Sequence, residues 1–184
     1  WFVHLAPPPA APIPQPAVDC TFDGERGINN VPPGVAASND LLAQFGDGDL
    51  GEEYESYNYV LTLDYALDNI DLQTIINYHE ADLAWVSDFD GGGVTSIFAG
   101  EANSFEQFAV EARAITKFDS PVNFVLGAYY QNTDRAFNQD VIFAFIQWTG
   151  PIADPNDEFT AYNKESGTDG ETWSVYGEVI WDIT

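Results

Sequence analysis

The chain has very few basic residues for its size. Of its 184 residues, 5 are lysine or arginine and 30 are aspartate or glutamate, which gives a formal net charge of −25. This balance argues against nucleic-acid binding, because a protein needs a cationic surface to displace counterions from phosphate. It also argues against docking onto anionic lipid headgroups. Most of the acid is expected on a solvated surface, and a loop surface that attracts cations is the alternative.

Sulfur and imidazole are nearly absent as well. The one cysteine, Cys20, cannot form an intrachain disulfide or supply a thiolate metal cluster. The two histidines, His4 and His79, lie on distant segments, so a catalytic centre built around histidine is not expected. The sequence contains no nucleophile-elbow, P-loop or dinucleotide-binding motif. These absences predict that the chain is not an enzyme.

Long apolar runs are missing too. No stretch of about 18 apolar residues occurs, which excludes a transmembrane helix but not transmembrane β-strands of about 9–11 residues. A chain of 184 residues with 45% hydrophobic residues is nevertheless long and apolar enough to fold as one domain. It begins at Trp1 with neither a methionine nor a signal-peptide pattern, and we expect it to be a piece of a longer protein.

Residues 1–52 are predicted to be irregular. The segment 7–16, PPPAAPIPQP, is too rich in proline for a helix or an interior strand. Glycine, proline, asparagine and aspartate stay frequent after it, and only residues 40–45 have the composition of a short helical turn.

From residue 53 onward, apolar and polar side chains alternate, which is typical of β-strands. Between Ser56 and Tyr65 the odd positions carry tyrosine and leucine, and most even positions carry polar side chains. The same period of two recurs in four further segments, at residues 72–79, 105–116, 122–131 and 172–184. Helices do not alternate with these strands, so the sequence predicts an all-β fold, an antiparallel up-and-down meander of long strands.

The connections between the predicted strands differ in length in a regular way. Tight turns at 66–69 and 118–121 alternate with long loops at 82–104 and 133–170. A soluble sandwich has no reason to place all its long loops at one end, whereas an outer-membrane barrel has short periplasmic turns and long external loops. We therefore expect part of a transmembrane β-barrel, with apolar faces toward membrane lipid and polar faces toward a water-filled interior.

Three segments resemble the TonB-dependent outer-membrane receptors. Residues 105–131, FEQFAVEARAITKFDSPVNFVLGAYYQ, are similar to a barrel hairpin of that family. Residues 172–182, TWSVYGEVIWD, resemble the next strand, and residues 72–78, LQTIINY, resemble a preceding one. The resemblance covers about residues 54–184, and residues 1–52 would then correspond to an extracellular loop.

This resemblance implies a location and a function. The family imports scarce nutrients such as ferric siderophores across the outer membrane of Gram-negative-type bacteria, using energy relayed by a TonB-type partner. The plug domain, the TonB-contacting box and the terminal barrel strand are not in this sequence, so the partner would act through another part of the parent protein.

Three aromatic residues lie in the predicted long loops and are candidates for binding a small-molecule ligand. They are Trp85, Phe89 and Trp148. Loops that carry aromatic side chains often contact ligands, and packing of the loops against each other is the alternative.

Two acidic, glycine-containing stretches are candidates for a calcium site. Residues 46–53 contain Asp47 and Asp49, and residues 87–93 contain Asp88 and Asp90. Carboxylates at alternate positions beside glycine can surround Ca²⁺, which prefers six to eight oxygen ligands. Neither stretch has the spacing of an EF-hand loop, so a solvated turn is the alternative. No other cofactor is expected.

Five strands also suggest a second interpretation. Single-chain bacterial barrels begin at about 8 strands, so five strands leave two unpaired edges. A processed fragment that forms homo-oligomers through these edges, as an extracellular fibre-like β-rich module, is the alternative to the receptor. A soluble sandwich that binds carbohydrate or calcium is a third interpretation.

Overall fold

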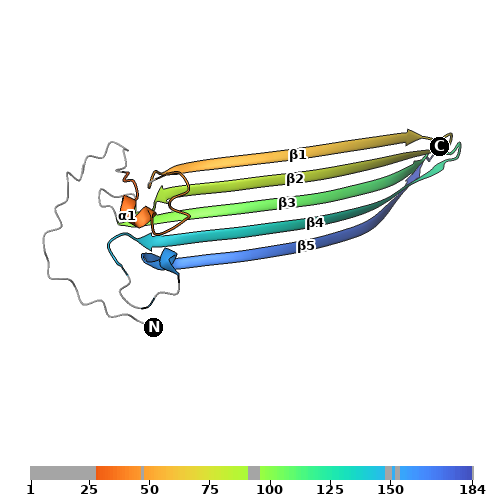
Figure 1. Ribbon diagram of the computed structural model, residues 1–184. Coiled ribbons are helices and arrows are strands. Elements are labelled where there is room, and N and C mark those ends of the chain that lie inside the picture. Colours follow the sequence, from red (N-terminus) through yellow and green to blue (C-terminus); the bar gives the residue numbers. More distant parts are fainter. Residues whose placement is uncertain (1–27, 47, 91–95, 148–150, 152–153, 184) are drawn as a thin grey trace. The chain divides into compact units, whose positions relative to one another are not determined.

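A computed structural model describes residues 28–46, 48–90, 96–147, 151 and 154–183. The described chain contains one α-helix, α1 (Pro33–Ala36), and one 3-10 helix, η1 (Pro155–Asp157). Its five strands are β1 (Gly51–Ala66), β2 (Ile70–Asp88), β3 (Ile97–Thr116), β4 (Val122–Phe143) and β5 (Thr160–Trp181) (Figure 1). The predicted all-β class is confirmed. No helix in the described ranges has the length and apolarity needed to cross a membrane.

The five strands form one open antiparallel sheet. Their order in the sheet is their order in the chain, β1-β2-β3-β4-β5, so the predicted meander is confirmed (Figure 1). Each strand pairs with its neighbour in sequence, which is the arrangement that short connections favour. Within the described residues, β1 and β5 are the two edges of the sheet.

The tight turns lie where the sequence predicts them. Between β1 and β2, the amide of Leu67 donates to the carbonyl of Ile70 at 2.9 Å. Between β3 and β4, the side chain of Asn123 accepts the amide of Phe118 at 2.7 Å. The amide of Lys117 also donates to the carbonyl of Asn69 at 2.7 Å, so these two turns are hydrogen-bonded to each other.

The strands are longer than the sequence predicts, and the predicted long loops are correspondingly too long. Because β2 ends at Asp88 and β3 begins at Ile97, the connection is 89–96 rather than 82–104. Because β4 ends at Phe143 and β5 begins at Thr160, the second connection is 144–159 rather than 133–170.

Polar side chains pair between neighbouring strands within these extensions. Gln139 on β4 donates to Glu101 on β3 at 2.8 Å, and Asn163 on β5 donates to Asp140 on β4 at 2.7 Å. Where both faces of a strand carry polar or small residues, hydrophobicity has no period of two, and the sequence does not distinguish a strand from a loop.

The chain divides into two compact units. One comprises residues 1–50, 86–99 and 141–161, and we call its described part the loop unit. The other comprises residues 51–85, 100–140 and 162–184, and we call its described part the sheet unit.

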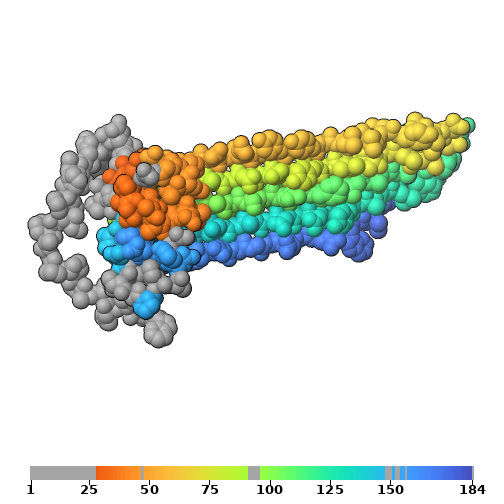
Figure 2. Space-filling view, in the orientation of Figure 1, coloured from red at the N-terminus to blue at the C-terminus, as the bar shows by residue number. Residues whose placement is uncertain are grey.

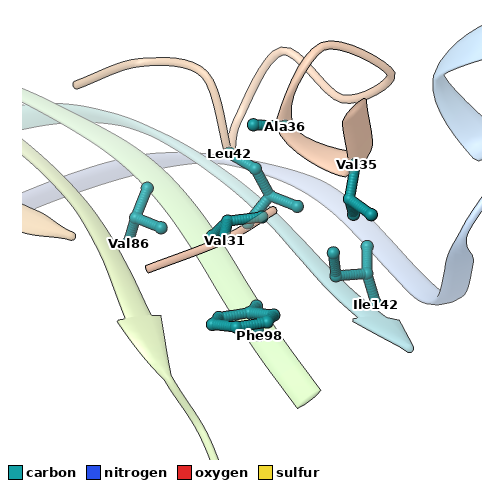
Figure 3. Close-up of a cluster of buried hydrophobic side chains, with 7 residues drawn as sticks. All are labelled: Val31, Val35, Ala36, Leu42, Val86, Phe98 and Ile142. Carbon is teal, nitrogen blue, oxygen red and sulfur yellow. The ribbon is translucent and has the colours of Figure 1, made fainter. Parts of the chain in front are cut away.

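The loop unit has a hydrophobic core of its own (Figure 3). Leu42 from the segment before β1 is fully buried, as are Phe98 from β3 and Ile142 from β4. The remaining members of this core are Val31, Val35, Ala36 and Val86. Helix α1 has proline at its first position, where the missing amide is not needed for a helical hydrogen bond. The described part of segment 1–52 is therefore not wholly irregular, because it forms one helical turn and packs as a core.

Gly48 closes this packed segment. Its carbonyl accepts the amide of Val31 at 2.9 Å, and its φ of +100° lies in the region that favours glycine. A Cβ at position 48 would overlap the backbone carbonyl of Val31.

Candidate functional site

The sheet unit has two chemically different faces, and side-chain contacts establish which residues share a face. Asn77 on β2 donates to Asn58 on β1 at 2.5 Å and accepts from Gln107 on β3 at 3.4 Å. Gln73 donates to Asp64 at 2.6 Å. Strand side chains alternate between the two faces of a sheet. The even-numbered residues of β1 and the odd-numbered residues of β2 and β3 therefore lie on the same face. We call this side the polar face.

Arginine and tyrosine extend the polar face toward β5. The Nε atom of Arg113 on β3 donates to Gln73 at 2.6 Å, so one arginine and one amide join the first three strands. The hydroxyl of Tyr176 on β5 donates to Glu111 on β3. The ring of Tyr176 passes over Gly127 on β4, where an added Cβ would overlap it.

His79 also lies on the polar face. Its Nε2 atom is 3.0 Å from the hydroxyl of Ser56, and its ring meets the ring of Phe105 edge-on with centroids 5.5 Å apart. This histidine joins neighbouring strands, and in the described part of the chain it belongs to no group of three or more side chains that could hold a metal.

The opposite face carries a band of mostly apolar side chains across all five strands. We call this band the apolar belt and the side that bears it the belt face. Its members are Tyr57, Tyr59, Leu61, Leu63, Tyr65, Leu72, Ile76, Tyr78, Phe108, Val110, Ala112, Ala114, Phe124, Leu126, Ala128, Tyr130, Trp173, Val175, Val179 and Trp181. Figure 2 shows the side chains of the five strands lying next to one another across one side of the sheet.

The belt is open to solvent and has a defined height. Leu126 is 63% exposed, Val175 is 74% exposed and Trp173 is 75% exposed. On β1 the belt runs from Tyr57 to Tyr65, a path of about 26 Å at the usual strand rise of about 3.3 Å. A tilt of about 40° reduces this to roughly 20 Å, near the apolar band of about 25 Å on outer-membrane barrels.

Beyond the belt, the same face becomes acidic. We call this region the acidic band, and its members are Glu80, Asp82, Glu106, Asp134, Glu165, Asp169 and Glu171. The hydroxyl of Tyr78, at the border of the belt, donates to Glu80 at 3.4 Å. A side-chain hydrogen bond with Asp169, partial desolvation and the negative charge of Asp169 raise the pKa of Asp134 above its ordinary value.

The predicted ligand-binding aromatics do not all lie in loops. Trp85 lies within β2 and is half-buried, because β2 extends further than the sequence predicts. Phe89 follows the end of β2, is 62% exposed, and its amide donates to the carbonyl of Ile97 at 2.9 Å. Trp148 lies outside the described residues. Nothing in the described geometry joins Trp85 and Phe89 into one ligand site.

Of the two predicted calcium ligands in the first acidic stretch, the structure describes Asp49 alone. Asp47 lies outside the described residues, and Asp49 accepts a hydrogen bond from the side-chain amide of Asn30 at 3.0 Å. Asp49 therefore acts at least partly as the acceptor of a local contact.

The second acidic stretch uses its carboxylates in the same way. Asp88 accepts the amide of Asn29 at 3.0 Å, and Asp90 accepts the amide of Ile97 at 2.9 Å and the hydroxyl of Ser96. No group of three or more potential metal ligands occurs in the ranges that the structure describes. Asp88 and Asp90 bind backbone amides next to strand ends, which is a common role of aspartate in turns.

The structure also places together residues that the sequence interpretation did not connect. A groove of about 660 Å³ crosses β2 to β5 on the belt face, beside small residues on neighbouring strands, Ala84, Ala102, Ala136 and Gly167. A smaller hollow of about 220 Å³ lies on the polar face between β4 and β5. Both lie in strand extensions that the sequence assigns to loops, so the faces of these residues could not be predicted.

No protein-family model matches the chain, and no curated protein is similar to it.

Proposed function

We propose that this chain is a segment of an outer-membrane β-barrel receptor of the TonB-dependent kind. In this proposal the apolar belt faces lipid and the polar face lines the water-filled interior. The observation that carries it is the apolar belt, which is exposed on all five strands and lies opposite a face whose polar side chains bond one another.

The polar face is suited to contact with water and the apolar belt to contact with lipid, which supports this orientation of the sheet. Amides and carboxylates such as those of Gln73 and Asp64 already have hydrogen-bond partners and can remain in contact with water. The leucine, valine and phenylalanine side chains of the belt cannot form hydrogen bonds with water, and contiguous apolar surface beyond a few hundred Å² usually marks a protein or membrane contact. A soluble sandwich would need a second sheet over the belt, whereas all five described strands belong to one sheet.

The length of the strands supports a barrel that projects beyond the membrane. About 9–11 residues suffice for a tilted strand to cross the hydrocarbon core, whereas β4 and β5 each have 22 residues. The additional residues of these strands carry the acidic band, including Asp134 and Asp169. Carboxylates are costly within hydrocarbon, so this arrangement fits strand extensions that stand in water.

The receptor part of the proposal depends on sequence resemblance. The β3–β4 hairpin contains residues 105–131, which resemble a hairpin of TonB-dependent receptors. In the parent protein, a small-molecule ligand such as a ferric siderophore would bind to the external loops and the interior. A TonB-type partner would supply energy through parts of that protein outside this sequence.

Tryptophan fluorescence tests the orientation. Trp173 and Trp181 lie in the belt and are 75% and 66% exposed. We expect the chain to float with zwitterionic lipid vesicles, and brominated acyl chains to quench its fluorescence. The double variant W173F/W181F should bind vesicles equally well and lose most of the quenching. If the chain stays in the aqueous fraction, or if the quenching does not depend on these two residues, the proposal is wrong.

The edges of the sheet favour one alternative function. In the described residues, β1 and β5 each have a strand neighbour on one side only. Unpaired edges are templates for another strand, so a fragment could assemble as an extracellular β-rich fibre. Regular multimers that form without lipid or detergent, together with failure to float with vesicles, would favour this alternative.

A further inference from the structure

The hollow between β4 and β5 gathers positive charge in a strongly negative protein. Arg135 and Phe137 on β4 line it, together with Lys164, Ser166 and Thr168 on β5. The ammonium of Lys164 lies 4.8 Å from the centroid of the Phe137 ring, within the range of a cation–π contact. Alternation along both strands places all five side chains on the polar face.

Neither cation at this hollow is neutralised by a carboxylate. Within the ranges that the structure describes, Lys117 forms an ion pair with Asp71 at 2.6 Å, and Arg113 donates to Gln73. Arg135 and Lys164 form no ion pair with any described residue. Two of the 5 basic residues of the chain therefore face one hollow with their charge available.

The sheet separates these cations from nearby carboxylates. Asp134, Glu165 and Asp169 are close to the hollow in sequence, but alternation puts them on the belt face. On the polar face, Glu101 of β3 accepts a hydrogen bond from Gln139 at 2.8 Å. Two cations and no carboxylate line the hollow itself, whereas the net charge of the chain is −25.

We propose that this hollow binds a small oxyanion, a carboxylate or phosphate group of a soluble molecule. The guanidinium of Arg135 presents a planar pair of donors that matches two oxygens of such a group. The ammonium of Lys164 adds a second charge, and the hydroxyls of Ser166 and Thr168 supply further donors. Whole drug-sized ligands occupy pockets of about 300–1,000 Å³, so a hollow of about 220 Å³ fits one anionic group and part of its carrier.

The binding site does not depend on the membrane orientation, whereas a role in import rests on the function proposed above. If the polar face lines a barrel interior, the hollow is a point at which an anionic nutrient is held on its way through. The charge of the rest of the protein would repel such a nutrient, so the two cations would determine where it binds.

Calorimetric titration of the purified chain with citrate or inorganic phosphate at low ionic strength tests the site. We expect a Kd in the millimolar range for at least one probe, since an open site with two cations binds weakly. R135Q and K164Q should each raise that Kd about tenfold, which corresponds to about 1.4 kcal/mol. A lower Kd for citrate would identify a carboxylate site, and a lower Kd for phosphate a phosphate site.

The matched control is K117Q, which removes the same single charge at the distant β3–β4 turn and should change the Kd less than about twofold. R135K retains the charge but lacks the planar guanidinium, so its Kd should lie between those of wild type and R135Q. Absence of binding by both probes, or an equal loss in K117Q, would overturn the proposal. Vesicle flotation is measured separately, so anion binding without flotation would retain this site and reject the barrel.

Discussion

An arginine at position 175 distinguishes a belt that faces lipid from one that faces water. Val175 lies on β5 within the apolar belt and is 74% exposed. Its neighbour Ser174 is also exposed and lies on the polar face. V175R and S174R therefore place the same charge on adjacent residues of one strand, on opposite faces of the sheet.

The two environments give different magnitudes. If the belt faces water, V175R removes only the buried quarter of the Val175 side chain. Burying a whole valine side chain is worth about 1.5–3 kcal/mol, so this loss is roughly 0.4–0.8 kcal/mol. In lipid, arginine on the outer face of a barrel costs about 2–4 kcal/mol at the midplane and less toward the interfaces. Residue 175 lies between the edge of the belt at Trp173 and its centre near Gly177, so we expect about 2 kcal/mol.

Vesicle flotation measures this difference. A cost of about 2 kcal/mol lowers the partition coefficient of V175R into zwitterionic vesicles roughly 30-fold, because each 1.4 kcal/mol is a factor of ten. S174R should change the coefficient less than about threefold, since its charge remains in water. Equal partition of V175R and wild type, or equal losses in both variants, would refute the assignment of the belt face to lipid.

Four further substitutions test the packing and the charge. G127A should destabilise the sheet by about 0.5–1.5 kcal/mol in urea unfolding, because the added Cβ displaces the exposed ring of Tyr176 and breaks its hydrogen bond to Glu111, and unchanged stability would contradict that contact. G48A combines a backbone overlap with a φ of +100° and should cost about 1–3 kcal/mol, whereas G34A, with nothing within 4 Å, should be neutral or stabilising. The pKa of Asp134 is raised in the folded state, so the folded protein binds this proton more tightly than the unfolded chain does. The stability that the protonated carboxyl contributes is therefore present at low pH and is lost as the pH rises through the folded-state pKa. D134N should therefore have a higher urea midpoint than wild type at pH 7 and the same midpoint below the ordinary carboxyl pKa of about 3.9, and a difference that persists in acid would contradict the carboxylate pair.

The candidate sites were predictable to different degrees. Alternation in residues 56–65 and 172–181 correctly separates the belt from the polar face, because hydrophobicity there has a clear period of two. The hollow around Arg135 was not predictable. It lies where β4 and β5 extend through polar sequence, and the two cations are brought together only by strand pairing.

The loop unit illustrates the same limit. Val31 and Leu42 lie in a segment rich in glycine and asparagine, and no local pattern predicts that they pack with Phe98 and Ile142. The 28–50 segment reaches its partners through contacts of long sequence separation. These contacts depend on where β2, β3 and β4 end, which a local reading does not determine.

The sequence by itself determined that the chain forms an antiparallel meander, where its tight turns lie, and which side chains of each alternating segment share a face. These features follow from local rules, since turn residues fix hairpins and strand side chains alternate. Only the tertiary structure decided how far the strands run and which residues of neighbouring strands meet. A shift of one residue between strands would exchange the two faces, and the pairs Asn58–Asn77 and Gln73–Arg113 fix the alignment that puts the polar residues on one side.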